Sequence, residues 1–463
     1  QPDIAFWRNF EARILELQQM GIEADIILWH PYDRWGFADM TDDQDDRYLR
    51  YCIARLSAFR NVWWSLANEF DFMTNQPNGH RGNKQMEDWD RFFSILQKED
   101  PFQRMRGIHN GRLWYDHTKP WVIHASLQTS DMKGGTQYRQ KFQKPVVYDE
   151  CRYEGNIPLG WGNLTAREMT QRFWLGTLSG CYVGHGETYK HPEDLLWWSK
   201  GGRLRGQSPD RIKWLKKLLQ SAPPFDELIP MGNDQGRFLL GKNGEYYLLY
   251  CLSGQIQKIS LPGDRPYKVD AIDPWKMTEW PVGSLKDGSF TATAPKHDLV
   301  YRFTPHARGE PLRPQVEPTA SITEGTPPLT VRFGSNTRHR VEWDFDDGSK
   351  SHQFEPRHTF TRPGIFEVTL TVTDDRGSSA RDKLTIIVDR DPTEPIVRAG
   401  YGAEDRPHLI SHGSARRRSD GGWLFSSTEP WGRIETPRDS SDKIGSFRSF
   451  TIAGWLNPET PAT

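Results

Sequence analysis

Two glutamates, each at the end of a short apolar run, are the residues of this chain best suited to carry out chemistry. Glu69 follows the run Val62-Trp63-Trp64-Ser65-Leu66-Ala67-Asn68, and Glu150 follows the run Lys144-Pro145-Val146-Val147-Tyr148-Asp149. Burying an isolated carboxylate is costly, so we expect each glutamate at the C-terminal end of a strand, facing a polar pocket. Two such groups predict catalysis by paired carboxylates, in which one transfers a proton and the other acts as nucleophile or base.

Alternating helices and strands over the first half of the chain would bring these two glutamates together. Apolar residues recur at helical spacing over 6–20, and a short apolar run follows at 24–29. Such alternation predicts a parallel sheet with crossover helices, in which all carboxyl ends of the strands open on one face. The predicted strands are 24–29, 62–67, 105–109, 121–126, 145–148 and 181–187, and the helices between them include 48–59, 89–96 and 169–178.

Further polar residues end the other predicted strands. His30 ends the strand at 24–29, His109 the strand at 105–109 and His124 the strand at 121–126, while His185 and Glu187 lie at the end of the last strand. These side chains could converge on one substrate, although any single histidine is as well explained as a packed residue of the core. Histidines near carboxylates also raise the alternative of a catalytic metal. No HExxH pair is present, and we expect neither a metal nor a cofactor.

The strand ends carry a resemblance to a known family. Asn68-Glu69 and, three strands later, Asp149-Glu150 resemble the acid/base on strand four and the nucleophile on strand seven of the large clan of retaining (β/α)8 glycoside hydrolases. Three stretches resemble a bacterial glycosidase family with flanking β-sandwich domains: His30-Pro31-Tyr32-Asp33-Arg34-Trp35-Gly36, Asp149-Glu150-Cys151-Arg152-Tyr153-Glu154-Gly155-Asn156 and Gly184-His185-Gly186-Glu187-Thr188-Tyr189. The resemblance covers roughly residues 1–305. It implies an α/β fold, a (β/α)8 TIM-type barrel lacking its first strands, and we interpret the chain as a fragment with strands one and two upstream of Gln1.

The resemblance also assigns roles to individual residues. Glu69 would protonate the leaving oxygen and Glu150 would attack the anomeric carbon, with the two carboxyl groups about 5–5.5 Å apart. A raised pKa would keep the acid Glu69 protonated near neutral pH, and Arg152 would hold Glu150 ionised. Asp149 points to the other side of its strand and is more easily explained as structural. The expected substrate-binding residues are His30, Asn68, His124, Arg152, His185 and Glu187.

All-β segments follow the barrel, which we place at residues 1–224. Alternating strands separated by Gly, Pro and Asp predict a small β-sandwich at 225–306, and Asp273-Pro274-Trp275 resembles the sandwich that follows the barrel in these glycosidases. Residues 314–390, with Val341-Glu342-Trp343-Asp344-Phe345-Asp346-Asp347-Gly348, closely resemble the Ig-like polycystic-kidney-disease (PKD) domain. Its acidic loop could bind Ca²⁺, but a solvated turn explains it better. Residues 392–463, ending with Ser449-Phe450-Thr451-Ile452-Ala453-Gly454-Trp455, resemble a truncated laminin-G or concanavalin-A-like jelly-roll domain.

Composition narrows the choice of function. A formal net charge of −1 gives no electrostatic reason to bind nucleic acid, and no apolar run is long enough to predict a membrane span. The four cysteines have no CxxC spacing, which disfavours a structural zinc site. We therefore expect a secreted or cell-surface glycoside hydrolase whose partner is a polysaccharide or oligosaccharide, with weak adhesion through the C-terminal β domains. The alternatives are a non-catalytic carbohydrate-binding or adhesive protein, and an extracellular protease, for which HExxH and GxSxG motifs are missing.

Overall fold

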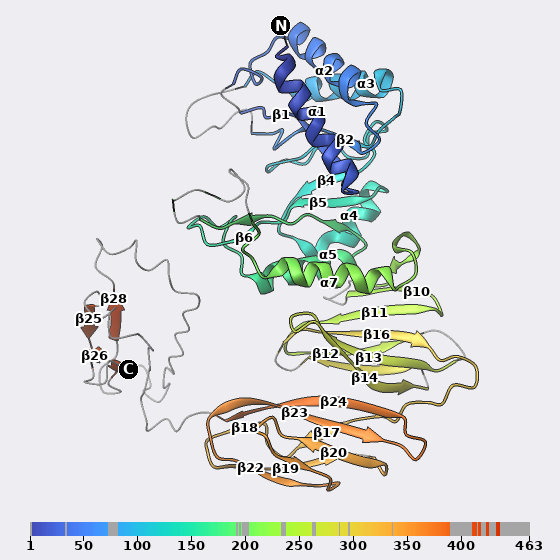
Figure 1. Cartoon of the computed structure of the whole chain (residues 1–463), viewed down its shortest axis with the longest axis vertical. Helices are drawn as coiled ribbons and strands as arrows, with labels where there is room; N and C mark the ends of the chain where they lie inside the picture. The colour runs from blue at the N-terminus through green and yellow to red at the C-terminus, as the bar shows by residue number, and fades with distance from the viewer. Residues whose placement is uncertain are drawn as a thin grey trace, which may run out of the picture.

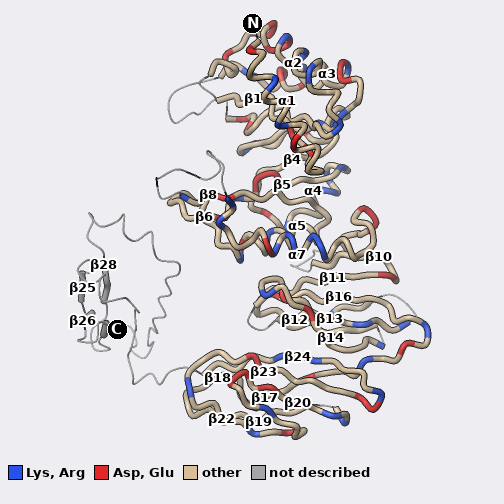
Figure 2. Tube along the Cα trace, viewed as in Figure 1, with Lys and Arg blue, Asp and Glu red and all other residues tan. Residues whose placement is uncertain are grey.

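The computed structural model describes residues 2–388 except 33–34, 73–81, 191–192, 194–195, 197–202, 233–237, 262–264, 287, 295–296 and 336. Beyond residue 388 it describes only the segments 410–413, 415–417, 423–425 and 432–435. An α/β part, a β-sandwich and a second β unit follow one another in a column, with the N-terminus at one end (Figure 1). Basic and acidic residues are interleaved along the described trace, in keeping with the near-zero net charge (Figure 2). Within the described residues, no helix combines the length and apolar character needed to cross a bilayer.

Six parallel strands organise the α/β part, as the alternating pattern predicted. They form two three-stranded sheets, in the orders β1-β2-β3 and β4-β5-β7. A hydrogen bond of 3.0 Å from the Ile123 N–H to the Arg106 carbonyl connects the two sheets. A short parallel pair, β6 (Glu154–Gly155) and β8 (Glu187–Thr188), follows β5 and β7 along the chain. The six strands are β1 (Ala24–Trp29), β2 (Val62–Ala67), β3 (Arg106–Gly107), β4 (Ala125–Gln128), β5 (Val146–Glu150) and β7 (Tyr182–Val183).

Crossover helices cover one face of these strands because their apolar residues recur at helical spacing. Trp64 of β2 is fully buried and belongs to the same core as Trp89 and Phe92 of the helix that follows. Local capping fixes the helix starts: the Asp3 side chain accepts from two N–H groups of the first helix, and Thr165 with Glu168 forms a capping box. The helices are α1 (Ile4–Gln19), α2 (Asp42–Leu56), α3 (Met86–Glu99), α4 (Gly135–Phe142), α5 (Ala166–Leu178) and α7 (Ser208–Gln220), with a 3₁₀ turn η1 (Met132–Gly134).

The outer strands of the parallel array are β1 and β7. On β1 the side chains that face away from the helices are open to solvent, and Ile27 is 52% exposed. The expectation of two further strands concerns residues outside this sequence and stays an expectation.

The β-sandwich packs directly on α5. Trp174 and Leu178 of that helix share a buried core with Leu248, Tyr250 and Val300 of the sandwich. Its antiparallel main sheet has the order β14-β13-β16-β11-β10-β9, and β12 pairs with β15. The strands are β9 (Ile229–Pro230), β10 (Phe238–Lys242), β11 (Tyr246–Cys251), β12 (Gln255–Ser260), β13 (Tyr267–Asp273), β14 (Thr278–Leu285), β15 (Ser289–Ala294) and β16 (Leu299–Pro305).

The second β unit has two small sheets around a separate core that includes Trp343 and Phe333. Its sheets have the orders β17-β19-β22 and β18-β24-β23-β20-β21. The Lys276–Glu367 ion pair joins it to the sandwich. The strands are β17 (Pro318–Ala320), β18 (Glu324–Gly325), β19 (Leu329–Ser335), β20 (Arg340–Asp344), β21 (Lys350–Ser351), β22 (Arg357–Phe360), β23 (Gly364–Thr373) and β24 (Ser379–Val388).

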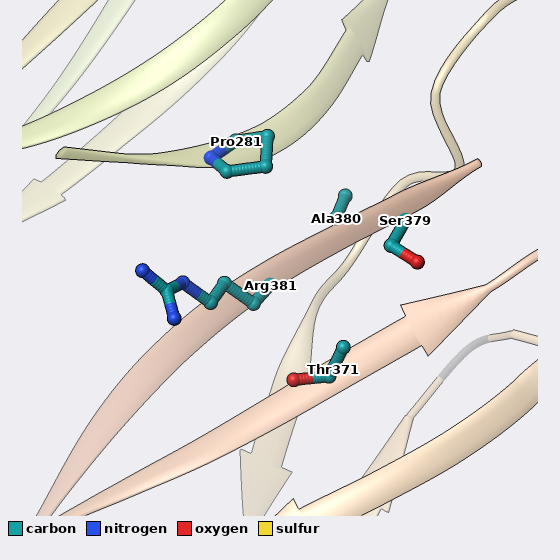
Figure 3. A pocket seen from close by; sticks show the side chains of 5 residues that line it. All are labelled: Pro281, Thr371, Ser379, Ala380 and Arg381. Carbon is teal, nitrogen blue, oxygen red and sulfur yellow. The ribbon is translucent and has the colours of Figure 1, made fainter.

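An open pocket lies at this junction between the two β units. Figure 3 shows Pro281 of β14 above β24, with Arg381 and Thr371 beside it. No aromatic or acidic side chain lines the pocket, so the chemistry expected from the glutamates does not take place here.

Little of the predicted lectin-like segment falls on described residues. Strand β25 (Ile410–Gly413) pairs with β28 (Gly432–Glu435), and β26 (Ala415–Arg417) pairs with β27 (Trp423–Phe425). The motif at 449–455 lies outside the described residues, so the lectin-like assignment stays a prediction.

Candidate active site

Glu69 lies directly beyond the end of β2, in a backbone conformation that few side chains adopt. Its φ is 47°, in the left-handed region that costs a residue with a side chain about 1–3 kcal/mol. Hydrogen bonds on either side hold this turn: the Asn68 N–H donates to the Trp29 carbonyl at 3.0 Å, and the Phe70 N–H donates to the His109 carbonyl at 2.9 Å. The strand ladder therefore stabilises a strained position, which is typical of functional sites.

Three side chains from three strand ends donate hydrogen bonds to the Glu69 carboxylate. The Tyr32 hydroxyl donates to Oε2, and the Asn68 amide donates to the same oxygen at 3.3 Å. From β4, the Gln128 amide donates to Oε1 at 3.0 Å. The Asn68 amide also donates to the Tyr32 hydroxyl at 2.8 Å, so these groups form one connected network around Glu69.

His109 determines how the Asn68 amide is oriented. Its Nδ1 lies 3.2 Å from Asn68 Oδ1. Burial lowers the pKa of His109 to about 4, so the ring is neutral at pH 7. Because Oδ1 can only accept a hydrogen bond, Nδ1 carries the proton and donates. The Asn68 NH₂ group is thereby directed toward Tyr32 and Glu69.

Glu150, the last residue of β5, has a strongly perturbed carboxyl group. Burial and, to a smaller extent, the charge of Glu69 raise its pKa to about 7, while a hydrogen bond from Tyr153 lowers it. Burial and the charge of Glu150 in turn raise the pKa of Tyr153. The two glutamates are thus electrostatically coupled across the strand ends. The raised pKa, which the sequence analysis expected on the acid, falls on the residue assigned as the nucleophile.

The structure distributes the other predicted residues differently. The centroids of the His30 and Tyr32 rings are 3.9 Å apart, so His30 lies next to the Glu69 network. Asn68 is within that network. Asp149 accepts a hydrogen bond from Ser126 of β4. His185 and Glu187 lie in a separate cluster with Glu154, and Glu187 is only 1% exposed.

The prediction that His124 ends its strand is wrong. Strand β4 begins at Ala125, so His124 precedes it and lies at the opposite end from Glu150. Its ring packs against the backbone of Gly107, and burial lowers its pKa to about 4. The apolar residues before it belong to a turn and connection, as the hydrogen bond from the Val122 N–H to the Lys119 carbonyl shows.

The contact expected between Arg152 and Glu150 is also wrong, because Arg152 bonds to Asn163 and Tyr153 bonds to Glu150. Arg152 has a φ of 73°, and its guanidinium donates to Asn163 Oδ1 at 3.1 Å. Among the described residues, Tyr153 is the side chain that hydrogen bonds the Glu150 carboxyl group. A left-handed residue turns the chain, so the neighbouring position rather than Arg152 reaches the carboxylate.

Three residues of this site were not predicted from the sequence: Tyr32, Gln128 and Tyr153. Tyr32 and Tyr153 lie within stretches already singled out, and their position three residues beyond the end of a strand could have indicated them. Gln128 had no local signal because its strand was placed too early. Together these side chains surround two carboxyl groups, and the charge of one, Glu69, raises the pKa of the other, Glu150. Coupled carboxyl groups are typical of sites for acid/base and nucleophilic chemistry.

Comparisons with known proteins show what two parts of the chain are similar to. Residues 1–222 match the family described as "Apiosidase-like, catalytic domain", and residues 311–388 match the PKD domain. The α/β part is therefore a glycoside-hydrolase-like domain, and the second β unit is a PKD domain. The predictions of a glycoside-hydrolase-like domain and of a PKD domain are thereby confirmed.

Solved structures and curated proteins add to this picture. A Bacteroides vulgatus ATCC 8482 protein provisionally described as a glycoside hydrolase is 31% identical, with a TM-score of 0.57 over 65% of this chain and 63% of its own. A family 5 glycoside hydrolase from the same organism, 17% identical with a TM-score of 0.51, covers 65% of this chain and 74% of its own and shares the fold alone. The pre-pro-metalloprotease PrtV of Vibrio cholerae serotype O1 is 42% identical over 59 residues, 13% of this chain and 6% of PrtV. The chain thus spans less than two thirds of the length of the 31% identical Bacteroides vulgatus protein and a small fraction of the length of PrtV.

Proposed function

We propose that this chain hydrolyses O-glycosidic bonds of a polysaccharide or oligosaccharide with retention of configuration. Glu69 is the acid/base and Glu150 the nucleophile. The observation that carries the proposal is the pair of glutamates at the carboxyl ends of β2 and β5, whose carboxyl groups are electrostatically coupled. Paired carboxylates on a glycoside-hydrolase-like domain support double displacement.

The proposed route assigns each proton. Glu69 protonates the leaving oxygen while the Glu150 carboxylate attacks the anomeric carbon, and Glu69 then removes a proton from the water that cleaves the glycosyl-enzyme bond. Glu150 must be ionised to attack, although burial favours its protonated form. The hydrogen bond from Tyr153 opposes that effect, so Tyr153 is a positioning residue for the nucleophile.

The network around Glu69 supports its role as the base of the second step, in which it takes a proton from water. Tyr32, Asn68 and Gln128 hold the carboxylate in place. We keep His30 and Asn68 as substrate contacts, because they lie at the strand ends beside Glu69. His124 has no part in this proposal, because it lies at the opposite end of the strands from Glu150. The same proposal includes a (β/α)8 barrel fold. The parallel strand order and the likeness to the family 5 glycoside hydrolase support it.

Substrate and location are part of the proposal. The family description names apiosidase activity, so apiosides belong in the substrate panel beside aryl glycosides and plant or algal polysaccharides. The PKD domain would act as a spacer or weak adhesive module outside the cell, as expected for modules of extracellular enzymes. We propose no cofactor for hydrolysis.

Replacement of the nucleophile tests the proposal. Glu150→Ala should lower kcat by several orders of magnitude, and azide should restore turnover by giving a glycosyl azide of inverted configuration. Glu23→Ala is the matched control, because Glu23 is exposed just before β1, at the opposite end of the strand array. Near-normal turnover of Glu150→Ala would contradict the assignment. Sugar binding without turnover by the unmodified chain would favour the adhesive alternative.

The stereochemistry of hydrolysis gives an independent test. Two displacements at one carbon restore the original configuration, so NMR should show a first-formed product with the anomeric configuration of the substrate. A first product of inverted configuration would exclude Glu150 as a nucleophile and would identify it instead as a base that activates water.

A further inference from the structure

Three potential metal ligands lie together just beyond the proposed active site. Glu154 on β6, Glu187 on β8 and His185 between β7 and β8 form what we call the β6–β8 cluster, in which one ligand atom from each residue lies within 4.8 Å of the others. The sequence analysis expected no metal and assigned His185 and Glu187 to the substrate. The burial of Glu187 argues against direct contact with a sugar.

Glu154 is fully buried, and its carboxyl oxygens accept hydrogen bonds from the start of α7 and from Tyr189. Oε1 accepts from the Gln207 N–H and the Tyr189 hydroxyl, both at 2.9 Å, and Oε2 accepts from the Ser208 N–H at 3.2 Å and from the Ser208 hydroxyl. The N–H groups of a helix start and its dipole favour a negative charge. Four donor groups therefore converge on the Glu154 carboxyl group.

Glu187 is a second buried carboxylate, and one of its oxygens has no hydrogen bond. Oε2 accepts from the Arg205 N–H at 2.7 Å, whereas Oε1 has no donor and lies 3.8 Å from His185 Nε2. Within the described part of the chain, no lysine or arginine forms an ion pair with Glu154 or Glu187. Buried carboxylates are costly unless they are paired or bind a metal.

We infer that the β6–β8 cluster binds one divalent transition-metal cation of the Zn²⁺ type through Glu154, His185 and Glu187. One imidazole nitrogen and two carboxylate oxygens suit Zn²⁺, whereas Ca²⁺ and Mg²⁺ prefer oxygen ligands alone. The unsatisfied Glu187 Oε1 provides a free ligand atom directed at the other two groups. The competing arrangement has no cation, with His185 Nε2–H donating to the Ser208 hydroxyl at 3.2 Å.

The cation would have a structural role with a link to the active site. It would fasten β6 and β8 to the start of α7, because its ligands and their hydrogen-bond partners come from these three elements. Tyr153 directly precedes Glu154, and a Cβ on Gly186 would lie 1.8 Å from the Tyr153 ring. The two chain segments that carry the ligands therefore hold Tyr153, the hydrogen-bond donor to Glu150.

Metal binding by the whole chain tests the inference. After dialysis against EDTA, titration with Zn²⁺ should show one strong site per chain, and Zn²⁺ at a hundredfold excess over Kd should raise Tm by about 5–10 °C. Ca²⁺ at the same concentration should have little effect. Glu187→Gln removes the free ligand atom while keeping the shape of the side chain, and it should abolish both responses. Glu168→Gln, the same change in the capping box of α5, should retain them.

The outcomes separate a site from a hydrogen-bond network. No shift of Tm with Zn²⁺, or an equal shift in Glu187→Gln, would overturn the inference, because the second result means that Zn²⁺ binds elsewhere. If Glu187→Gln does not fold, His185→Gln replaces it, since that ring is partly exposed and its loss is better tolerated. Stoichiometry and Tm do not depend on turnover, so a failure here leaves the proposed glycosidase activity untouched, and the reverse also holds.

Discussion

The hydroxyl of Tyr153 should control the pH at which this protein works. Tyr153 donates a hydrogen bond to Glu150, which burial and the charge of Glu69 otherwise push toward its protonated form. The substitution Tyr153→Phe removes the donor and keeps the ring that packs on Gly186. The pKa of Glu150 should therefore rise. In a plot of kcat/KM against pH, the acidic limb should move to higher pH.

The size of the shift follows from the strength of one hydrogen bond. A hydrogen bond to a charged group contributes about 1.5–3 kcal/mol, and one pKa unit corresponds to about 1.4 kcal/mol, so the limb should move up by about 1–2 units. In the unmodified protein the pKa of Glu150 is raised to about 7, so about half of the carboxyl groups are ionised at pH 7. In the variant the ionised fraction at pH 7 falls to about 1–10%, which lowers kcat/KM about 5- to 50-fold.

The assay is a pH profile of kcat/KM with an aryl glycoside that has a good leaving group. Such a substrate needs little protonation by Glu69, so the acidic limb reports the ionisation of the nucleophile. Tyr148→Phe is the matched control. Tyr148 lies on β5, the strand of Glu150, but its hydroxyl donates to the Asp131 carbonyl and not to Glu150. An unchanged limb in Tyr153→Phe, or a shift to lower pH, would refute the reasoning.

Two more substitutions give distinct outcomes. Glu69→Gln removes the charge that raises the pKa of Glu150, so with the same activated substrate the acidic limb should move to lower pH; a shift upward would show that the two carboxyl groups are not coupled. Lys84→Met leaves Asp45 as an unpaired charge, because the two side chains pair at 2.8 Å and each is 1% exposed. Urea denaturation should show a loss of about 3–5 kcal/mol, against less than about 0.5 kcal/mol for the exposed Lys98→Met; equal losses would contradict the argument.

Local patterns were sufficient for the strands and for the two glutamates. The spacing of apolar residues predicted six parallel strands, because a buried strand and an amphipathic helix each repeat with their own period. The polar residues Glu69 and Glu150 marked strand ends, since a buried strand does not tolerate an unpaired carboxylate within it. Where an apolar run continued into a connection, as before His124, the same pattern placed the strand end wrongly.

Contacts between strands could not be predicted from those patterns. That Gln128 reaches Glu69, and that Tyr153 rather than Arg152 serves Glu150, depends on strand register and on the left-handed turn at Arg152. These are properties of the assembled sheet, where residues far apart in the chain meet.

The amino-acid order determined which segments become strands and which side chains stand at their ends, because those choices depend on neighbours within one or two turns of chain. The electrostatics came only with the tertiary structure. The pKa of Glu150 is set by its burial and by the distance to the charge of Glu69, about eighty positions away in the sequence. Likewise, Glu154, His185 and Glu187 become candidate ligands only because β6, β8 and α7 meet in space.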